Sequence, residues 1–179
     1  MRRSRADGDE DFTVFATQAS DRLYRSAYLL TTSHAAAEDL LQTTLVKAFS
    51  GWRRVRATDD PVAYAHRILL NTFLSERRLR RSGELAVADL PEIGPADAVS
   101  GSGLSEEVAE RLALAEALRQ LSALDRAVVV LRFWHDHSVA VTAAELDLTE
   151  AAVKNRTSRA LSRLRDLLAD DHPIPRSTR

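Results

Sequence analysis

Basic and polar side chains near the C-terminus recur at helical spacing and have the chemistry of a DNA-reading surface. Arginine and asparagine can pair with two atoms of a base edge in the major groove, and lysine and serine can bind phosphates or bases. Residues three or four apart in a helix lie on the same side of it. One side of the stretch after Thr149 would therefore present Lys154, Asn155, Ser158, Arg159 and Ser162.

The residues around this surface predict a helix-turn-helix. We expect a short helix from Val139 to Leu146, a break at Asp147 and Leu148, and a second helix with Thr149 as its N-cap. Small and apolar residues recur on the inner side of the second helix, at Val153, Thr157, Ala160, Leu161, Leu164 and Leu168. In a helix-turn-helix the second helix enters the major groove. A solvated helix in a small bundle would explain this stretch equally well by itself.

A second group of side chains suits single-stranded or unstacked nucleic acid. The Asp60-Pro61 pair predicts the start of a helix that runs to about Arg81. Its inner side carries Val62, Ala65, Leu69 and Phe73, and its outer side carries Tyr64, Arg67, Asn71, Ser75 and Arg78, with Trp52 nearby. Aromatic rings stack on bases, guanidinium groups bind phosphates, and amides can read base edges. An ordinary solvated face with one tyrosine is the simpler explanation of this helix taken alone.

A third group lies in the helix expected from His34 to about Phe49, which Ser33 would cap. Its inner side would carry Ala37, Leu41, Leu45 and Ala48, and a different side would carry Asp39, Gln42, Val46 and Phe49. Two apolar residues beside two polar ones make a mixed surface of the kind that binds a partner helix. For Phe49 alone, packing into the core is the simpler interpretation.

The fold class that these patterns predict is all-α, with two small helical domains joined by a flexible acidic linker. Residues 1–10 are expected to be disordered, and the first domain, residues 11–82, would open with an amphipathic helix from Phe12 to Leu30. Residues 82–107 contain four of the six glycines and six acidic residues but no basic one, which predicts a linker over 83–106. The second domain would span 107–170, where the all-round apolar run 128–131 indicates a buried helix, and 171–179 would be a disordered tail.

Other classes of protein are poorly supported. The chain has no cysteine, and His135 and His137 have no third ligand placed for a metal, so neither a metal site nor a cofactor is expected. Glycine-rich phosphate loops and GxSxG motifs are missing, which argues against an enzyme. The N-terminus lacks the apolar core of a secretory signal and no apolar run could cross a membrane, so we expect a cytoplasmic protein without membrane insertion. Of the 25 basic residues only two are lysines, which suits nucleic-acid contact and equally suits a GC-rich genome.

Taken together, the order and spacing of three stretches resemble an RNA polymerase sigma factor. They are AEDLLQTTLVKAF at 37–49, DPVAYAHRILLNT at 60–72, and LDRAVVVLRFW at 124–134 with AAVKNRTSRALSRLR at 151–165. Within the sigma-70 superfamily the chain is similar to the extracytoplasmic-function group, the minimal kind with only domains two and four. The resemblance covers nearly everything from Phe12 to Leu168.

The resemblance implies a role for each of the three surfaces. Core RNA polymerase would bind through its clamp coiled coil to Asp39, Gln42, Val46 and Phe49. The −10 promoter element would be melted and read by Trp52, Arg56, Tyr64, Arg67, Asn71 and Arg78. The −35 element would be read by Lys154, Asn155, Ser158 and Arg159, with Arg156 nearer to phosphate. The polymerase flap would be a further contact, and an anti-sigma factor is a partner that the resemblance allows.

Some positions depart from the pattern of the family. Thr43 stands where an acidic residue is usual, Leu45 where an aromatic is usual, and Tyr64 where tryptophan is commoner. The turn usually carries glycine where this chain has Asp147, a residue that tolerates left-handed backbone. Val141 replaces a commonly acidic residue and Asn155 a commonly small one, and both lie in the helix-turn-helix.

Three functions compete at this stage. A promoter-specificity subunit explains all three surfaces. A stand-alone helix-turn-helix regulator gives no role to the residues from Trp52 to Asn71, and a module that sequesters another regulator through the Asp39–Phe49 side gives none to the basic helix. The acidic linker would either mimic nucleic acid along the polymerase or serve as a solvated spacer.

Overall fold

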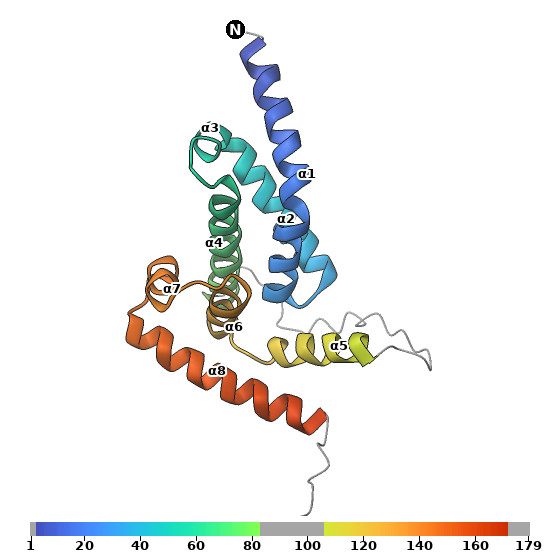
Figure 1. Ribbon diagram of the computed structural model, residues 1–179, viewed down its shortest axis with the longest axis vertical. Coiled ribbons are helices and arrows are strands. Elements are labelled where there is room, and N and C mark those ends of the chain that lie inside the picture. Colours follow the sequence, from blue (N-terminus) through green and yellow to red (C-terminus); the bar gives the residue numbers. More distant parts are fainter. Residues whose placement is uncertain (1–2, 83–105, 172–179) are drawn as a thin grey trace, which may run out of the picture. The chain divides into compact units, whose positions relative to one another are not determined.

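The computed structural model describes residues 3–82 and 106–171, and within them every regular element is a helix, as the sequence predicts (Figure 1). The chain divides into two compact units, Met1–Ala88 and Asp89–Arg179. Each unit is built around its own core, and the first unit carries two of the candidate surfaces and the second unit carries one. The predicted linker lies outside the described residues except for Glu106, the first residue of a helix, and the predicted tail lies outside them except for Asp171.

The first unit consists of α1 (Arg3–Thr31), α2 (His34–Ser50), the short α3 (Trp52–Val55) and α4 (Pro61–Ser82). α1 and α2 pack together as a hairpin, and α4 contacts both of them (Figure 1). The largest fully buried apolar side chains between these helices are Leu23, Leu30, Val55 and Leu69. Burial of such side chains contributes on the order of 1.5–3 kcal/mol each, which is what holds three amphipathic helices together.

Two expectations about this unit are corrected. α1 begins at Arg3, so residues 3–10 are helical and do not belong to the disordered segment that was expected; extending a helix already anchored from Phe12 onward costs little per added residue. In α2 the buried residues are Ala37, Leu40, Thr44 and Ala48, whereas Leu41 and Leu45 are only half-buried. Thr44 satisfies its buried hydroxyl by donating to the Leu40 carbonyl over 2.7 Å, so a threonine can lie in the apolar stripe.

Helix starts are set by the residues that the sequence indicated. The Ser33 hydroxyl accepts a hydrogen bond from the amide of Ala36, and the Asp60 carboxylate accepts one from the amide of Ala63 over 2.9 Å. Pro61 then occupies the first position of α4, where a missing N–H leaves no carbonyl unpaired. These caps fix where α2 and α4 begin and therefore which of their side chains face each other.

The second unit consists of α5 (Glu106–Arg119), α6 (Ala123–Val129), the π-helical turn η1 (Val130–Trp134), α7 (Val139–Leu146) and α8 (Glu150–Asp171). α8 contacts α5, α6 and α7. The run 128–131 is buried, as expected from its all-round apolar character. Arg126 is also buried, and its Nη2 donates to the carbonyls of Arg119, the last residue of α5, and of Leu121, which follows the helix.

The helix-turn-helix prediction is confirmed in its bounds and its caps. α7 spans Val139–Leu146, Asp147 adopts the left-handed conformation with φ 53°, and the Thr149 hydroxyl accepts a hydrogen bond from the amide of Ala152 over 3.1 Å. Val153, Ala160 and Leu164 of α8 are buried, while Thr157, Leu161 and Leu168 are half-buried. The opposite side of α8 carries the exposed residues Lys154, Asn155, Ser158 and Arg159.

Candidate functional site

The mixed surface predicted on α2 is exposed. Asp39, Gln42, Val46 and Phe49 are all solvent-accessible, with Val46 65% and Phe49 48% exposed. The alternative that Phe49 packs into the core is therefore not what the structure shows. Its ring instead lies against the ring of Phe12 on α1, with centroids 4.9 Å apart in an edge-on arrangement. An exposed apolar pair beside a carboxylate and an amide retains the chemistry of a surface that binds a partner helix.

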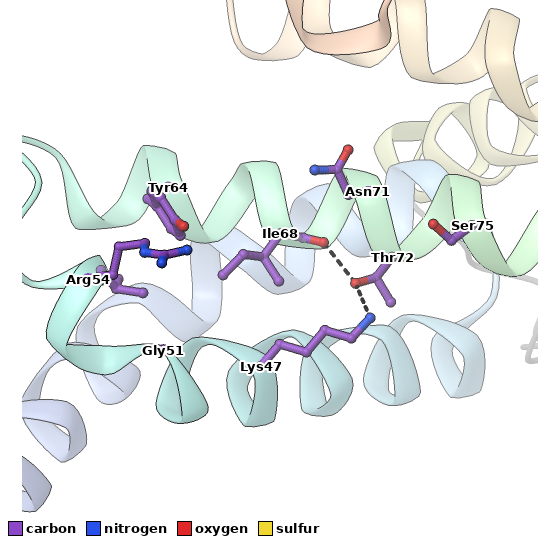
Figure 2. A pocket seen from close by; sticks show the side chains of 9 residues that line it. Lys47, Gly51, Arg54, Tyr64, Ile68, Asn71, Thr72 and Ser75 are labelled. Carbon is purple, nitrogen blue, oxygen red and sulfur yellow. Dashed lines mark hydrogen bonds between the residues drawn. The ribbon is translucent and has the colours of Figure 1, made fainter.

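A groove of about 330 Å³ separates α2 and α3 from α4 (Figure 2). Three residues of the predicted outer side of α4, Tyr64, Asn71 and Ser75, line it. The other lining residues are Lys47 of α2, Gly51 between α2 and α3, Arg54 and Val55 of α3, and Ile68 and Thr72 of α4. In Figure 2 the Lys47 side chain extends from α2 toward Thr72 on α4, and its Nζ donates to the Thr72 hydroxyl over 3.0 Å.

This lining has the composition of a nucleotide site. Lys47 and Arg54 supply positive charge for a phosphate, Tyr64 supplies an aromatic ring for stacking, and Asn71 supplies an amide that can read a base. The Thr72 hydroxyl is already engaged, because it accepts from Lys47 and donates to the Ile68 carbonyl over 2.8 Å. The groove therefore offers charge, stacking and hydrogen bonding around a small apolar floor.

Sequence reasoning missed Lys47, Arg54 and Thr72 as members of this site. It grouped residues along one helix, whereas Lys47 and Thr72 are 25 residues apart and meet only because α2 packs against α4. A single-helix pattern carries no information about such a pair. The signal that could have found Lys47 and Arg54 is the basic character of 47–56, shortly before the capped helix α4. Thr72 has no such signal.

The base-stacking role predicted for Trp52 does not agree with its position in the structure. Trp52 was expected to stand beside the Tyr64 side as a base-stacking residue, but it is only 9% exposed and belongs to a core cluster with Ala48 and Val55. Phe12 and Phe15 of α1 pack against the indole, with ring centroids 5.3 and 5.0 Å from it. The sequence could not reveal this because the contact of Phe12 and Phe15 with Trp52 depends on how α1 packs against the other helices and not on spacing within one helix.

Three further predicted −10 residues lie outside the groove lining. Arg67 and Arg78 are exposed on α4. The Arg56 guanidinium lies 3.2 Å from the Asp11 carboxylate, and both side chains are about half exposed, at 48% and 60%. A pair this exposed is worth less than about 1 kcal/mol, so a phosphate could replace Asp11 with little cost.

On α8 the structure separates the predicted residues into two kinds. Lys154, Asn155, Ser158 and Arg159 are exposed on the side opposite the core. Arg156 is half-buried, and its Nη1 lies 2.7 Å from Oδ1 of Asp125 on α6. Burial would raise the pKa of Asp125, but hydrogen bonds from Ser122 and Arg156 and the charges of Arg156 and Arg159 outweigh it and hold that pKa below its usual range.

One of the two histidines near η1 lies beside an acid. Nδ1 of His137 lies 3.4 Å from the Glu145 carboxylate of α7, and the rings of His135 and His137 are tilted by 43° with centroids 5.6 Å apart. Within residues 3–82 and 106–171, no cluster of three or more potential ligands could hold a metal ion. Among the same residues, no helix is both long and apolar enough to cross a membrane.

Each of the two units matches the model of a known protein family. The family model described as Sigma-70 region 2 matches residues 15–83, and the model described as Sigma-70, region 4 matches residues 111–164. RNA polymerase sigma-E factor of Streptomyces coelicolor is 35% identical over 158 residues, which cover 88% of this chain and 86% of that protein. The chain belongs to the sigma-70 family. Another relative of this sigma factor is ECF RNA polymerase sigma factor SigL of Mycobacterium tuberculosis, 33% identical over 80% of each chain, which places it in the extracytoplasmic-function group.

A solved structure supports the same assignment. The sigma factor RpoE from Bartonella quintana, crystallised with the anti-sigma factor NepR, is similar to this sigma factor with a TM-score of 0.61 and 28% identity. The match covers 91% of this chain and 99% of that one. The residues matched by the two family models include all three surfaces described above.

Proposed function

We propose that this alternative sigma factor binds core RNA polymerase through the exposed side of α2 and directs it to promoters through two separate DNA contacts. The proposal rests on three surfaces of distinct chemistry in this sigma factor. They are a mixed apolar and acidic surface, a cationic groove with an aromatic ring, and the basic side of a helix. The first is Asp39, Gln42, Val46 and Phe49, and we assign it to the clamp coiled coil of the polymerase.

The groove between α2 and α4 is assigned to the −10 element. When strands separate, an unstacked base could enter beside Tyr64 and Asn71 while its phosphates lie near Lys47 and Arg54. Arg56, Arg67 and Arg78 would hold the neighbouring backbone. Binding one extruded strand favours the open state of the duplex because the protein contacts stabilise only that state. The protein needs no catalytic group of its own for this.

The exposed side of α8 is assigned to the −35 element. Asn155 and Arg159 can form hydrogen bonds with base edges in the major groove, and Lys154 and Ser158 are suited to neighbouring bases or phosphates. Duplex reading by α8 would position the polymerase, and the groove in the first unit would then receive the opened strand. A sigma factor acts where its polymerase acts, so we propose the cytoplasm as its location.

Two further partners follow from the surface and the relatives. Phe133, Trp134 and Val141 are exposed apolar residues on the contacting elements η1 and α7, and we propose that they bind the polymerase flap. The relative from Bartonella quintana was crystallised with an anti-sigma factor, and we propose that this chain is held by a protein of that class when inactive. Such a protein would compete with polymerase for the exposed apolar residues.

Transcription in vitro with the cognate core polymerase and a library of genomic promoters tests the proposal. Arg159→Ala should weaken binding of the holoenzyme to the −35 duplex, and Asn71→Ala should impair open-complex formation with little change in −35 binding. Loss at the same step in both variants would contradict the division between the two surfaces. Binding of an operator by the free chain, without co-purification of core polymerase, would favour a stand-alone regulator instead.

Polymerase binding can be tested separately. Val46→Asp adds a charge to the exposed centre of the α2 surface and should lower the affinity for core polymerase at least tenfold without unfolding the chain. Val14→Asp is the matched control, because Val14 is 57% exposed and lies about 200° around α1 from Phe12, the residue that contacts Phe49. Equal losses in the two variants would show that the α2 surface has no special role.

A further inference from the structure

The ion pair between Arg156 and Asp125 gives one of the predicted DNA contacts a different role. It joins α6 to the N-terminal third of α8 across 31 residues of sequence, with Nη1 and Oδ1 2.7 Å apart. The two side chains are 27% and 23% exposed, so the pair is largely shielded from water. An ion pair shielded in this way is screened by salt much less than an exposed one.

Asp125 also forms hydrogen bonds within α6 and its N-cap. Its Oδ2 accepts a hydrogen bond from the Ser122 hydroxyl over 2.7 Å, and the same hydroxyl accepts from the Asp125 amide over 3.1 Å. Ser122 is the N-cap of α6, so the carboxylate is tied to the start of that helix. If Arg156 were removed, a partly buried carboxylate would lose its hydrogen-bonded cation and would keep only the more distant charge of Arg159.

The position of Arg156 on α8 also differs from that of its neighbours. Successive residues in a helix are about 100° apart, so Arg156 lies within about 60° of Val153 and of Ala160. Both of these side chains are in the core, with 0% and 2% exposed. Arg156 is therefore at the border of the buried stripe, beside rather than on the exposed side that carries Asn155 and Arg159.

We propose that Arg156 is a positioning residue that binds Asp125 and fixes the rotation of α8, and that it does not bind DNA. The inference rests on the proposed −35 role of α8 and specifies how that helix is held. With the pair intact, Asn155 and Arg159 point away from the core at a fixed angle relative to α6. Without it, α8 keeps its apolar stripe but no longer has the ion pair that orients the helix.

Binding of the holoenzyme to a duplex fragment that contains only the −35 element tests this assignment. The dissociation constant is measured over a range of salt concentrations for Arg156→Ala, Asp125→Asn and Arg159→Ala. The slope of log affinity against log salt should fall by about 0.9 for each phosphate that the protein no longer binds. We expect Arg156→Ala to lower affinity three- to tenfold with no change in this slope, and Asp125→Asn to lower it similarly.

The Asp125→Asn variant separates the two roles of Arg156 by the direction of its effect. If Arg156 bound a phosphate, removing its intramolecular partner would free it, so affinity would stay the same or increase and Arg156→Ala would reduce the slope; either result would overturn the proposal. The exchange variant Asp125→Arg with Arg156→Asp should recover affinity, and circular dichroism confirms that each variant is folded. Failure of Arg159→Ala to change affinity would instead contradict the −35 role of α8.

Discussion

The Lys47 ammonium on α2 donates a hydrogen bond to the Thr72 hydroxyl on α4 over 3.0 Å, across the groove assigned to the −10 element (Figure 2). Val46, the residue before it, points outward on the surface assigned to polymerase. α2 therefore carries both assigned surfaces, one on its exposed side and one along the groove. Binding of polymerase and binding of DNA would stabilise the same helix.

Lys47→Met should impair strand opening more than polymerase binding. The substitution keeps most of the length of the side chain but removes the charge that would meet a phosphate in the groove, together with the hydrogen bond to Thr72. We expect open-complex formation to fall at least about tenfold, since the net contribution of a hydrogen bond to a charged group is about 1.5–3 kcal/mol and about 1.4 kcal/mol corresponds to a factor of ten. Fluorescence of 2-aminopurine placed in the −10 element measures opening, and Lys47→Arg is the charge-conserving control. An unchanged opening rate in Lys47→Met would remove Lys47 from the site.

Replacement of Trp52 separates a core role from a DNA role. Trp52→Ala should destabilise the first unit by about 3–5 kcal/mol, the usual cost of removing a large aromatic side chain from a core. Trp52→Phe should cost much less, because the buried Nε1 has no hydrogen-bond partner to lose. Urea unfolding followed by circular dichroism measures both effects. Trp134→Phe is the control, since Trp134 is 51% exposed and should leave stability nearly unchanged.

Sequence patterns predicted elements well and contacts between elements poorly. The bounds of α7, the caps at Ser33, Asp60 and Thr149, and the exposed sides of α2 and α8 all follow from local rules of spacing and capping. The burial of Trp52 and the Arg156–Asp125 pair depend on which helix covers which. In the sequence, a tryptophan beside arginines suggests a nucleic-acid contact. The structure changes that interpretation because a second helix covers the tryptophan.

The same limit explains the missed groove. Tyr64 and Asn71 were found because they lie on one side of one helix, but Lys47 and Arg54 reach the same space from α2 and α3. Spacing within a helix predicts which residues share one side of it. Which residues of another helix face that side depends on how the two helices pack. Residues that complete a site from a second element are therefore the ones that a single-sequence pattern misses.

Thr32→Gly should stabilise the first unit. Thr32 lies between α1 and α2 with φ 57°, a left-handed conformation that is strained for a β-branched side chain and free of that strain for glycine. We expect a gain of about 1 kcal/mol in the free energy of unfolding, reduced by the greater entropy of glycine in the unfolded chain. Thermal unfolding measures it. Asp147→Gly is the comparison, and its gain should be smaller because aspartate tolerates φ 53° better than threonine tolerates 57°. A lower melting temperature for Thr32→Gly would show that the threonine side chain contributes more than the strain removes.

The stability of the second unit should depend on the charge of Asp125 in acid. The pKa of Asp125 is lower in the folded chain than in the unfolded one, because the hydrogen bonds from Ser122 and Arg156 and the charges of Arg156 and Arg159 outweigh the effect of burial. The unfolded chain therefore binds this proton more readily, so the contribution is present above the unfolded pKa of about 3.9 and is lost as pH falls through the lower folded value. Asp125→Asn should lower the stability of the unit at pH 7, and the difference from the unsubstituted chain should shrink below about pH 4. Urea unfolding between pH 7 and pH 3 measures that difference, with Asp166→Asn on the exposed side of α8 as a control. A difference that stays constant over this range would show that the carboxylate charge contributes nothing and that Asp125 acts only through its shape.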